Sequence, residues 1–256
     1  MLTSESRFRP FPKLAAPRRL GVASQGDFGP SIKMISWNMF KARRRGWLLD
    51  LESLTAGVEL VLLQEAVLHG GLAHPFHLAS GMEWIMAETL ANGGGTTTGP
   101  KSGSRVKAIY SEALRSPDNE PLLGTPKSAL ITTYPFSDTT LMAINVHAIN
   151  FVPLAKFARQ VEQIAACASG HKGPCIVAGD FNTWNRSRLN ILGDIMKETG
   201  MRRVPAEHAS WLHLKRVLDH VFYRDLRLMS ARSLPHVKTS DHVPLWAEFG
   251  MPLNRD

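Results

Sequence analysis

The chain alternates short apolar segments with amphipathic stretches, and this alternation restricts its fold more than any other feature of the sequence. Short runs rich in Val, Ile, Leu and aromatic residues, bounded by turn-forming residues, are typical of buried strands. The predicted strands are residues 32–38, 59–64, 83–88, 105–110, 128–134, 140–147, 174–179, 217–223 and 243–249. No apolar run approaches the roughly 20 residues that a transmembrane helix needs, so no membrane span is expected.

Amphipathic periodicity predicts a helix over residues 153–169. Its apolar side chains recur at steps of three and four and share one face: Leu154, Phe157, Ala158, Val161, Ile164 and Ala165. Residues 45–56 and 187–199 predict further helices. Helices and strands intermixed in this way predict an α/β fold. Several late strands follow one another with no helix between them, so the sheets are expected to be mixed.

Two segments are predicted to lie outside the regular structure. Residues 1–30 are basic and lack the apolar core of a signal peptide, which predicts a flexible arm ahead of one domain spanning 31–256. A cleaved targeting peptide is the alternative, but Glu5 and the early prolines do not suit an amphipathic presequence. The stretch from Gly93 to Gly103 predicts a mobile loop, since it lacks the Lys-Ser/Thr ending of a nucleotide-binding loop. We expect a cytoplasmic, monomeric protein.

The formal net charge of +8 favours anionic partners such as nucleic acid, phosphorylated metabolites or acidic lipid. Solubility alone is the alternative explanation. The positive charge is concentrated in short clusters: Arg43-Arg44-Arg45, Arg186 with Arg188, Arg202-Arg203 and Lys215-Arg216.

Polar residues interrupt the apolar pattern at the strand ends, which is where α/β folds place catalytic groups. They are Asn38, Glu65, His147, Asn150, Asp180, Asn182, Asp219, His220, Asp241 and His242. A single one of these residues is more often a turn former or a solvated cap. Six strand ends that all carry carboxylates, amides or imidazoles point to a common site instead. Hard oxygen ligands of this kind suit Mg²⁺ or Mn²⁺.

These segments, taken in order, resemble the endonuclease/exonuclease/phosphatase superfamily, whose best-known fold is that of pancreatic deoxyribonuclease. The motifs are Trp37-Asn38, Leu63-Gln64-Glu65, Asn145-Val146-His147, Gly179-Asp180-Phe181-Asn182, Leu218-Asp219-His220 and Ser240-Asp241-His242. Lys127-Ser128-Ala129-Leu130 and His147-Ala148-Ile149-Asn150-Phe151 are similar to the bacterial YafD-like branch. The resemblance implies a four-layer α/β sandwich, in which two mixed sheets pack face to face with helices outside.

The resemblance also implies roles for individual residues. Glu65 would hold the divalent cation, Mg²⁺ or Mn²⁺, with help from Asn38 and Asp241. Asp180 would position or deprotonate the attacking water, and Asn182 would hold a phosphate oxygen. His147 would contact the phosphate beside Asn150. Asp219 would orient His242, which would act either as the base or as a charge stabiliser.

Two features depart from the family pattern or leave alternatives open. Phe40 stands where some members carry a carboxylate, which puts a two-metal site in doubt. Arg186 and Arg188 would either grip substrate phosphates or begin an exposed helix, and His220 is expected to be structural.

The expected function is metal-dependent hydrolysis of phosphodiesters, with nucleic acid as the favoured substrate. The alternatives are a phosphomonoesterase or lipid-headgroup phosphodiesterase on the same site, or an inactive binding module. An apolar hairpin beside the site would favour lipid, and the sequence identifies none.

Overall fold

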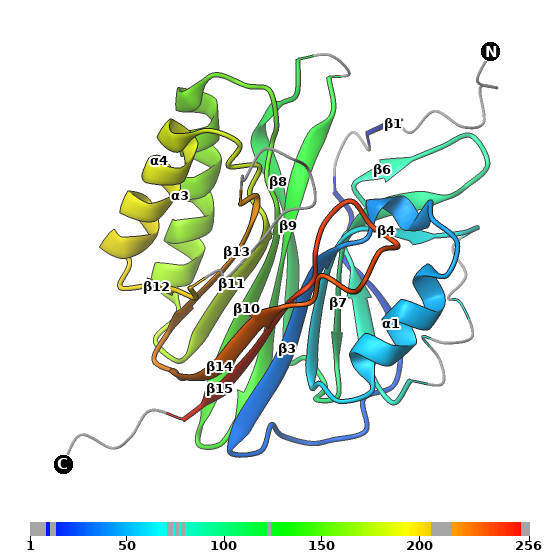
Figure 1. The fold of residues 1–256 in the computed structure, drawn as a ribbon, viewed down its shortest axis with the longest axis vertical. Helices are drawn as coiled ribbons and strands as arrows, with labels where there is room; N and C mark the ends of the chain where they lie inside the picture. Colours follow the sequence, from blue (N-terminus) through cyan, green and yellow to red (C-terminus); the bar gives the residue numbers. More distant parts are fainter. Residues whose placement is uncertain are drawn as a thin grey trace.

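The computed structural model describes residues 9–10, 14–70, 74, 77, 80–121, 124–205 and 217–251. Two β-sheets pack face to face, and helices cover their outer faces (Figure 1). A core of apolar side chains from both sheets fills the space between them, and two smaller cores lie beneath the helices. The expected four-layer α/β sandwich is therefore confirmed.

Both sheets mix parallel and antiparallel pairs. The first sheet runs in the order β1 (Arg9–Pro10), β6 (Leu90–Ala91), β7 (Thr97–Ser104), β4 (Leu60–Leu68), β3 (Ser31–Asn38), β15 (Leu245–Gly250) and β14 (Arg227–Ser233). Beside it, β5 (Glu83–Met86) pairs with β7 and with β2 (Arg18–Gly21). The second sheet runs in the order β12 (Arg202–Arg203), β13 (Asp219–Arg224), β11 (Cys175–Asp180), β10 (Thr139–His147), β9 (Pro126–Phe136) and β8 (Tyr110–Asn119).

The strand directions bring the polar strand ends to one edge. In the first sheet β3 and β4 are parallel, so Asn38 and Gln64 lie side by side. In the second sheet β10 and β11 are parallel, and β13 runs antiparallel to β11. The end of β10, the end of β11 and the start of β13 therefore coincide.

The three predicted helices are present with closely similar bounds. The first, α1 (Trp47–Thr55), covers the outer face of the first sheet. The outer face of the second sheet is covered by α3 (Leu154–Gly170) and α4 (Arg186–Glu198) (Figure 1). Among the described residues, no helix combines the length and apolarity that a bilayer crossing requires.

The prediction of a mobile loop from Gly93 to Gly103 was wrong, because Thr97–Ser104 forms the fully buried strand β7. The glycines are needed for close packing. A Cβ on Gly99 would lie 1.9 Å from the Ala87 carbonyl oxygen, and one on Gly103 would lie 2.5 Å from the Trp84 ring. The predicted strand 105–110 was also wrong, since residues 105–109 connect β7 to β8.

The N-terminal segment differs from the flexible arm expected through residue 30. Arg18–Gly21 pairs with β5, and Phe28 is buried in the core between the sheets. Asp27 also accepts a hydrogen bond from the Ser137 N–H. The folded domain thus begins before residue 30, while residues 1–8 and 11–13 of the expected arm lie outside the described residues.

Candidate active site

The converging strand ends line a cavity of about 250 Å³. Eight of the residues singled out from the sequence form part of its wall: Asn38, Glu65, His147, Asn150, Asp180, Asn182, Asp241 and His242. They come from both sheets and from the loops that follow the strands. The packing of the two sheets therefore assembles a single site from side chains up to about 200 positions apart in the sequence.

Glu65 reaches the cavity because β4 is irregular at this point. The pairing of β4 with β7 shifts register between Leu63 and Ala66, and Glu65 has a φ of 51°. This left-handed conformation is unfavourable for most residues and is often found at functional sites. Glu65 Oε2 lies 2.8 Å from Lys41 Nζ. Burial opposes ionisation of Glu65, but the nearby ammonium groups of Lys41 and Lys127 outweigh it and lower the pKa.

Asp180, at the end of β11, is almost completely buried beneath the cavity. Its Oδ1 accepts a hydrogen bond from the Asn182 N–H at 2.9 Å, and its Oδ2 accepts one from Asn38 Nδ2 at 3.1 Å. Burial raises the pKa of Asp180 to about 6, and the neighbouring His242 limits this rise. The carboxylate is thus ionised at neutral pH and more basic than an ordinary aspartate.

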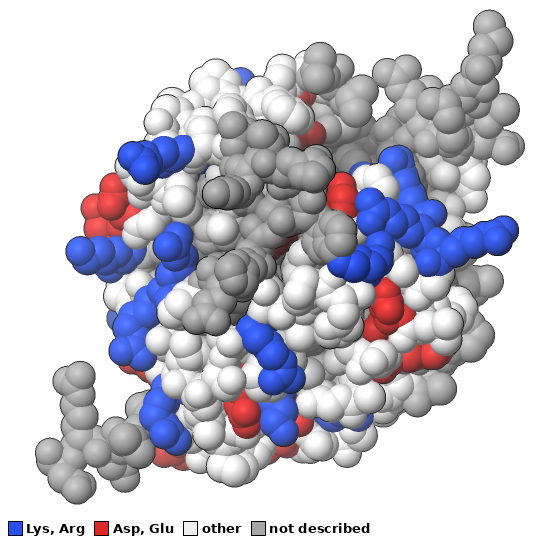
Figure 2. Space-filling model, in the orientation of Figure 1, with Lys and Arg blue, Asp and Glu red and all other residues white. Residues whose placement is uncertain are grey.

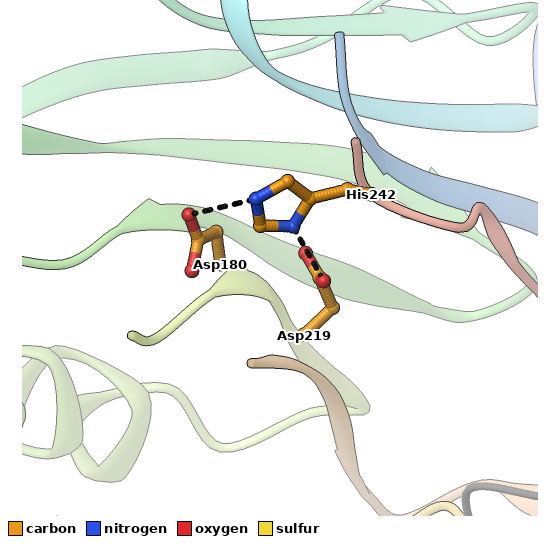
Figure 3. A group of neighbouring side chains, drawn as sticks. All are labelled: Asp180, Asp219 and His242. Carbon is orange, nitrogen blue, oxygen red and sulfur yellow. Dashed lines mark hydrogen bonds and ion pairs between the residues drawn. The ribbon is translucent and has the colours of Figure 1, made fainter. Parts of the chain in front are cut away.

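His242 lies between two carboxylates (Figure 3). Its Nδ1 is 2.7 Å from Asp219 Oδ2, and its Nε2 is 3.9 Å from Asp180 Oδ2. Burial alone would favour the neutral ring, but Asp219 and Asp180 raise the pKa of His242 to about 10. The imidazole therefore carries a positive charge at neutral pH. Asp219, behind the ring, sets its orientation.

His147, at the end of β10, differs from His242 in charge. Its Nε2 lies 3.7 Å from Asp180 Oδ2 and 3.9 Å from Glu65 Oε1. Burial, together with the positive charges of Lys127 and Lys41, lowers the pKa of His147 well below its usual value. The site thus pairs a neutral imidazole with a charged one, and different environments of two similar groups are a common basis for different catalytic roles.

The residues expected to hold a divalent cation fit that task. Glu65 and Asp241 present carboxylates to the cavity, and Asn38 presents an amide whose Oδ1 accepts a hydrogen bond from the Phe40 N–H at 3.0 Å. Among the described residues, Asp180, Asp219 and His242 also lie close enough to share an ion. His242 Nδ1 and Asp219 Oδ2 are hydrogen-bonded to each other at 2.7 Å, however, so neither atom is open to a metal in this arrangement. The donor set around Glu65 is therefore the better match.

Asn150 is part of the cavity wall, but its side-chain oxygen is already engaged. Asn150 Oδ1 accepts hydrogen bonds from the Phe151 N–H and from Trp184 Nε1–H, both at 2.9 Å. Its backbone N–H donates to Glu120 Oε1 at 2.8 Å. The side-chain oxygen of Asn150 therefore positions the neighbouring aromatic rings, while a contact between Asn150 and substrate stays a prediction.

Neither Arg186 nor Arg188 is among the described residues that line the cavity. Arg186 is exposed at the start of α4. Arg188 was predicted either to contact substrate or to begin an exposed helix, yet it is completely buried. Its guanidinium lies 3.9 Å from the centre of the Phe157 ring and donates to the Ile149 carbonyl oxygen. Arg188 therefore matches neither predicted alternative. It supports the loop after β10.

Two lysines on the cavity wall, Lys41 and Lys127, were not identified from the sequence. Lys127 Nζ is 3.7 Å from Glu120 Oε1, and Lys41 pairs with Glu65. Lys41 follows Asn38 by three residues, and Lys127, noted only as part of a motif segment, is the second residue of β9. The useful signal was the position of each lysine beside a motif segment, but a lysine beside a strand is usually exposed.

Figure 2 shows Lys and Arg side chains gathered over the segment before α1, where Arg43, Arg44 and Arg45 are exposed. Arg43 and Arg44 pack over the Phe40 ring. Arg44 also donates to the Ser240 carbonyl oxygen, so it supports the loop that carries His242. Lys215 and Arg216, the last predicted basic cluster, lie outside the described residues.

The contacts of His220 indicate a structural role, and its burial predicts that the folded state loses stability in acid. It is buried, its Nε2 lies 2.7 Å from Thr183 Oγ1, and burial lowers its pKa to about 3. Below the usual pKa of about 6.5 the unfolded chain binds a proton that the folded chain does not. The stability from neutral His220 is therefore present above pH ~6.5 and is lost as the pH falls toward 3.

We expect His220→Phe, which fills the site without titrating, to lose less stability on acidification. Relative to pH 7.5, the parent chain should lose about 2 kcal/mol more than the variant at pH 5. Urea unfolding at both pH values measures the difference. Parallel losses in the two chains would show that His220 is not the acid-sensitive group.

Comparison with known proteins agrees with the fold and the motif order. The sequence profile of the Endonuclease/Exonuclease/phosphatase family matches residues 35–242. A UPF0294 protein of Yersinia pseudotuberculosis is 36% identical over 224 residues, covering 85% of this chain and 83% of that protein. A UPF0294 protein of Vibrio vulnificus is 33% identical over 236 residues, covering 88% and 78%.

Solved structures share the fold at low sequence identity. An endonuclease/exonuclease/phosphatase from Beutenbergia cavernae superposes with a TM-score of 0.66 at 15% identity, covering 87% of this chain and 72% of that one. D. rerio TDP2 complexed with single-strand DNA product has a TM-score of 0.66 at 19% identity, covering 87% and 100%. Since the family profile spans most of the chain and includes every motif from Asn38 to His242, this protein belongs to the endonuclease/exonuclease/phosphatase family.

Proposed function

We propose that this member of a phosphoester-hydrolase family cleaves phosphodiester bonds of nucleic acid and uses Mg²⁺ or Mn²⁺. One observation carries the proposal. A charged His242, held between Asp219 and Asp180, lies on the wall of a polar cavity that also presents Glu65. This arrangement combines a base, a positive charge and an oxygen ligand for a cation in one site. All three help when water attacks an anionic ester.

In the proposed mechanism Asp180 takes a proton from the attacking water, because it is ionised and raised in basicity at neutral pH. The water oxygen then bonds to phosphorus, and the ester P–O bond breaks with its electron pair passing to the leaving oxygen. His242 is already protonated, so it offsets charge on the phosphoryl oxygens rather than acting as the base. Asn182 and the neutral His147 line the same cavity and would orient the phosphate.

Glu65, Asp241 and Asn38 would hold the cation. When bound there, the cation would polarise a phosphate oxygen and stabilise the leaving oxygen. Lys41 pairs with Glu65 and would have to give up part of that contact. Its ammonium would then be free to approach the phosphate.

Charge and family relationship support nucleic acid as the substrate. The chain has a net charge of +8, and Lys41 and Lys127 place positive charge on the cavity wall. D. rerio TDP2, which shares the fold, is described in complex with single-strand DNA product. We also propose that this protein is a cytoplasmic monomer and that its substrate is a nucleic acid.

A panel of phosphate esters tests the proposal. The parent chain should hydrolyse bis(4-nitrophenyl) phosphate and single-stranded oligonucleotides in Mg²⁺ or Mn²⁺, and should lose activity in EDTA. The monoester 4-nitrophenyl phosphate should be a poorer substrate. Purified Asp180→Asn, prepared in parallel, controls for contaminating phosphatases. Faster turnover of the monoester than of the diester would refute the diester assignment.

Glu65→Gln should weaken Mn²⁺ binding by about tenfold or more, because it removes a charged oxygen ligand while keeping its shape. Isothermal titration with Mn²⁺ measures the change directly and does not depend on turnover. Glu120→Gln is the matched control, since Glu120 lies on the same cavity wall and the substitution also removes one charge. Equal losses in both variants would indicate a general charge effect and exclude Glu65 as a specific ligand.

A further inference from the structure

An exposed aromatic ring, backed by a second one, stands at the rim of the proposed catalytic cavity. Phe151 is 65% exposed and forms part of the cavity wall. The Trp184 ring stacks on it, with centroids 6.5 Å apart and planes inclined by 30°. A ligand that covered this ring would remove apolar surface from water, so a ring that borders a polar cavity can contribute to binding.

The rings are held in place by their surroundings. Phe151 has a φ of 52°, a conformation that costs free energy for a residue with a side chain. Asn150 Oδ1 binds the Phe151 N–H and Trp184 Nε1–H together. Below them, the buried Arg188 donates to the Ile149 carbonyl oxygen and lies 5.7 Å from the centre of the Trp184 ring. The exposed ring is thus presented by a rigid, strained loop.

The charge on the adjoining cavity wall indicates which class of ligand would bind the Phe151 ring. Lys41 and Lys127 line the same cavity as Phe151, so a site for an anion adjoins a flat apolar surface. A nucleotide combines these two features, since its phosphate is anionic and its base is a planar π-system. Bases commonly stack on aromatic side chains in single-strand-binding grooves, with little sequence preference.

We propose that Phe151, supported by Trp184, is a stacking platform for a nucleobase of a single-stranded nucleic acid whose phosphate occupies the catalytic cavity. This inference rests on the proposed function and specifies how the substrate is held. Asn150 and Arg188 act as positioning residues, because they orient the rings without facing the base. The platform would favour an unpaired base, since a base within a duplex is already stacked.

Binding of single-stranded oligonucleotides tests the platform. The full chain carrying Asp180→Asn is titrated with a fluorescently labelled oligonucleotide, and anisotropy gives the affinity. We expect Phe151→Leu in this background to weaken binding by about tenfold, because leucine keeps the apolar surface but lacks the π-face. Phe151→Tyr is the matched control, which retains the ring and should bind like the parent. Phenylalanine, leucine and tyrosine all carry the same backbone strain at the positive φ of position 151. Thermal unfolding should therefore show that the parent and both variants are equally stable.

An abasic oligomer of equal length keeps the phosphates and removes the bases. It should bind the parent weakly and should be insensitive to Phe151→Leu. Equal loss of the normal and abasic oligomers in Phe151→Leu, or undetectable binding of the normal oligomer at low salt, would overturn the platform. So would binding of phosphatidylglycerol vesicles by the parent chain with oligonucleotide affinity unchanged in Phe151→Leu, because the ring would then serve a lipid surface.

Failure of the platform can be told apart from failure of the proposed function. Hydrolysis of bis(4-nitrophenyl) phosphate that depends on Asp180 reports on the catalytic site alone. A chain that hydrolyses this ester but binds normal and abasic oligomers equally well keeps the proposed function and loses the platform.

Discussion

His242→Ala is expected to lower kcat by roughly 10²–10⁴-fold, the usual scale for a positioned acid–base or charge-stabilising group. The variant loses the positive charge beside the phosphate. It also leaves the carboxylate of Asp219 buried with its partner gone, because His242 Nδ1 is the group that lies 2.7 Å from Asp219 Oδ2. Asp219 Oδ1 has no hydrogen-bond partner among the described residues. Steady-state hydrolysis of a diester and urea unfolding measure the two effects.

Combining His242→Ala with Asp219→Asn separates the effect on catalysis from the effect on stability. Breaking a buried ion pair from one side leaves a buried charge, so His242→Ala should also cost about 3 kcal/mol of folding free energy. The double variant should regain much of that stability, since the stranded charge is gone. It should remain as inactive as His242→Ala alone, because residues that act as a unit give non-additive losses. Additive losses in kcat would show that the two residues act independently.

Asp180→Asn should lower turnover by about 10²–10⁴-fold or more, because it removes the proposed base. Asparagine keeps an oxygen that can accept the Asn182 N–H, at the cost of the bond from Asn38 Nδ2. It also removes a negative charge that burial disfavours, as the pKa of about 6 at Asp180 indicates. The thermal midpoint of the variant is therefore expected to equal or exceed that of the parent.

Calorimetry at neutral pH, alongside the kinetic assay, tests this separation. A large drop in the melting temperature of Asp180→Asn would favour a structural role for the carboxylate. Retention of full activity would move the base assignment to another group. An inactive variant of unchanged stability supports the catalytic assignment, since active-site groups are often placed at a cost to folding.

Much of the architecture followed from local sequence patterns. The predicted strands 128–134 and 140–147 and the helix 153–169 lie within two residues of the observed elements at each end. The strands are buried along most of their length and the helix is buried on one face, so composition and spacing are sufficient to identify them. The exposed edge strands β8 and β14 contain many polar residues. They lack this burial pattern, so they were not predicted.

Two features of the sequence were misinterpreted because their meaning depends on residues that are neighbours in space. Gly99 and Gly103 suggested a loop, although they lie in a central strand whose neighbours leave no space for a Cβ. Arg188 suggested an exposed position, although two aromatic rings and a carbonyl oxygen accommodate it in the interior. Apart from the contact of Arg188 with Trp184, the decisive contacts come from segments distant in the chain.

The sequence by itself determined the buried strands that end in a carboxylate, amide or imidazole, because those are properties of consecutive residues. Only the tertiary structure decided how these ends act on one another. It places His242 between Asp219 and Asp180, and so makes one histidine of the site charged while His147 stays neutral. It also pairs Lys41 with Glu65. Protonation and ion pairing depend on distances of a few ångströms between groups on different strands, and those distances arise only when sheet register and sheet packing are established.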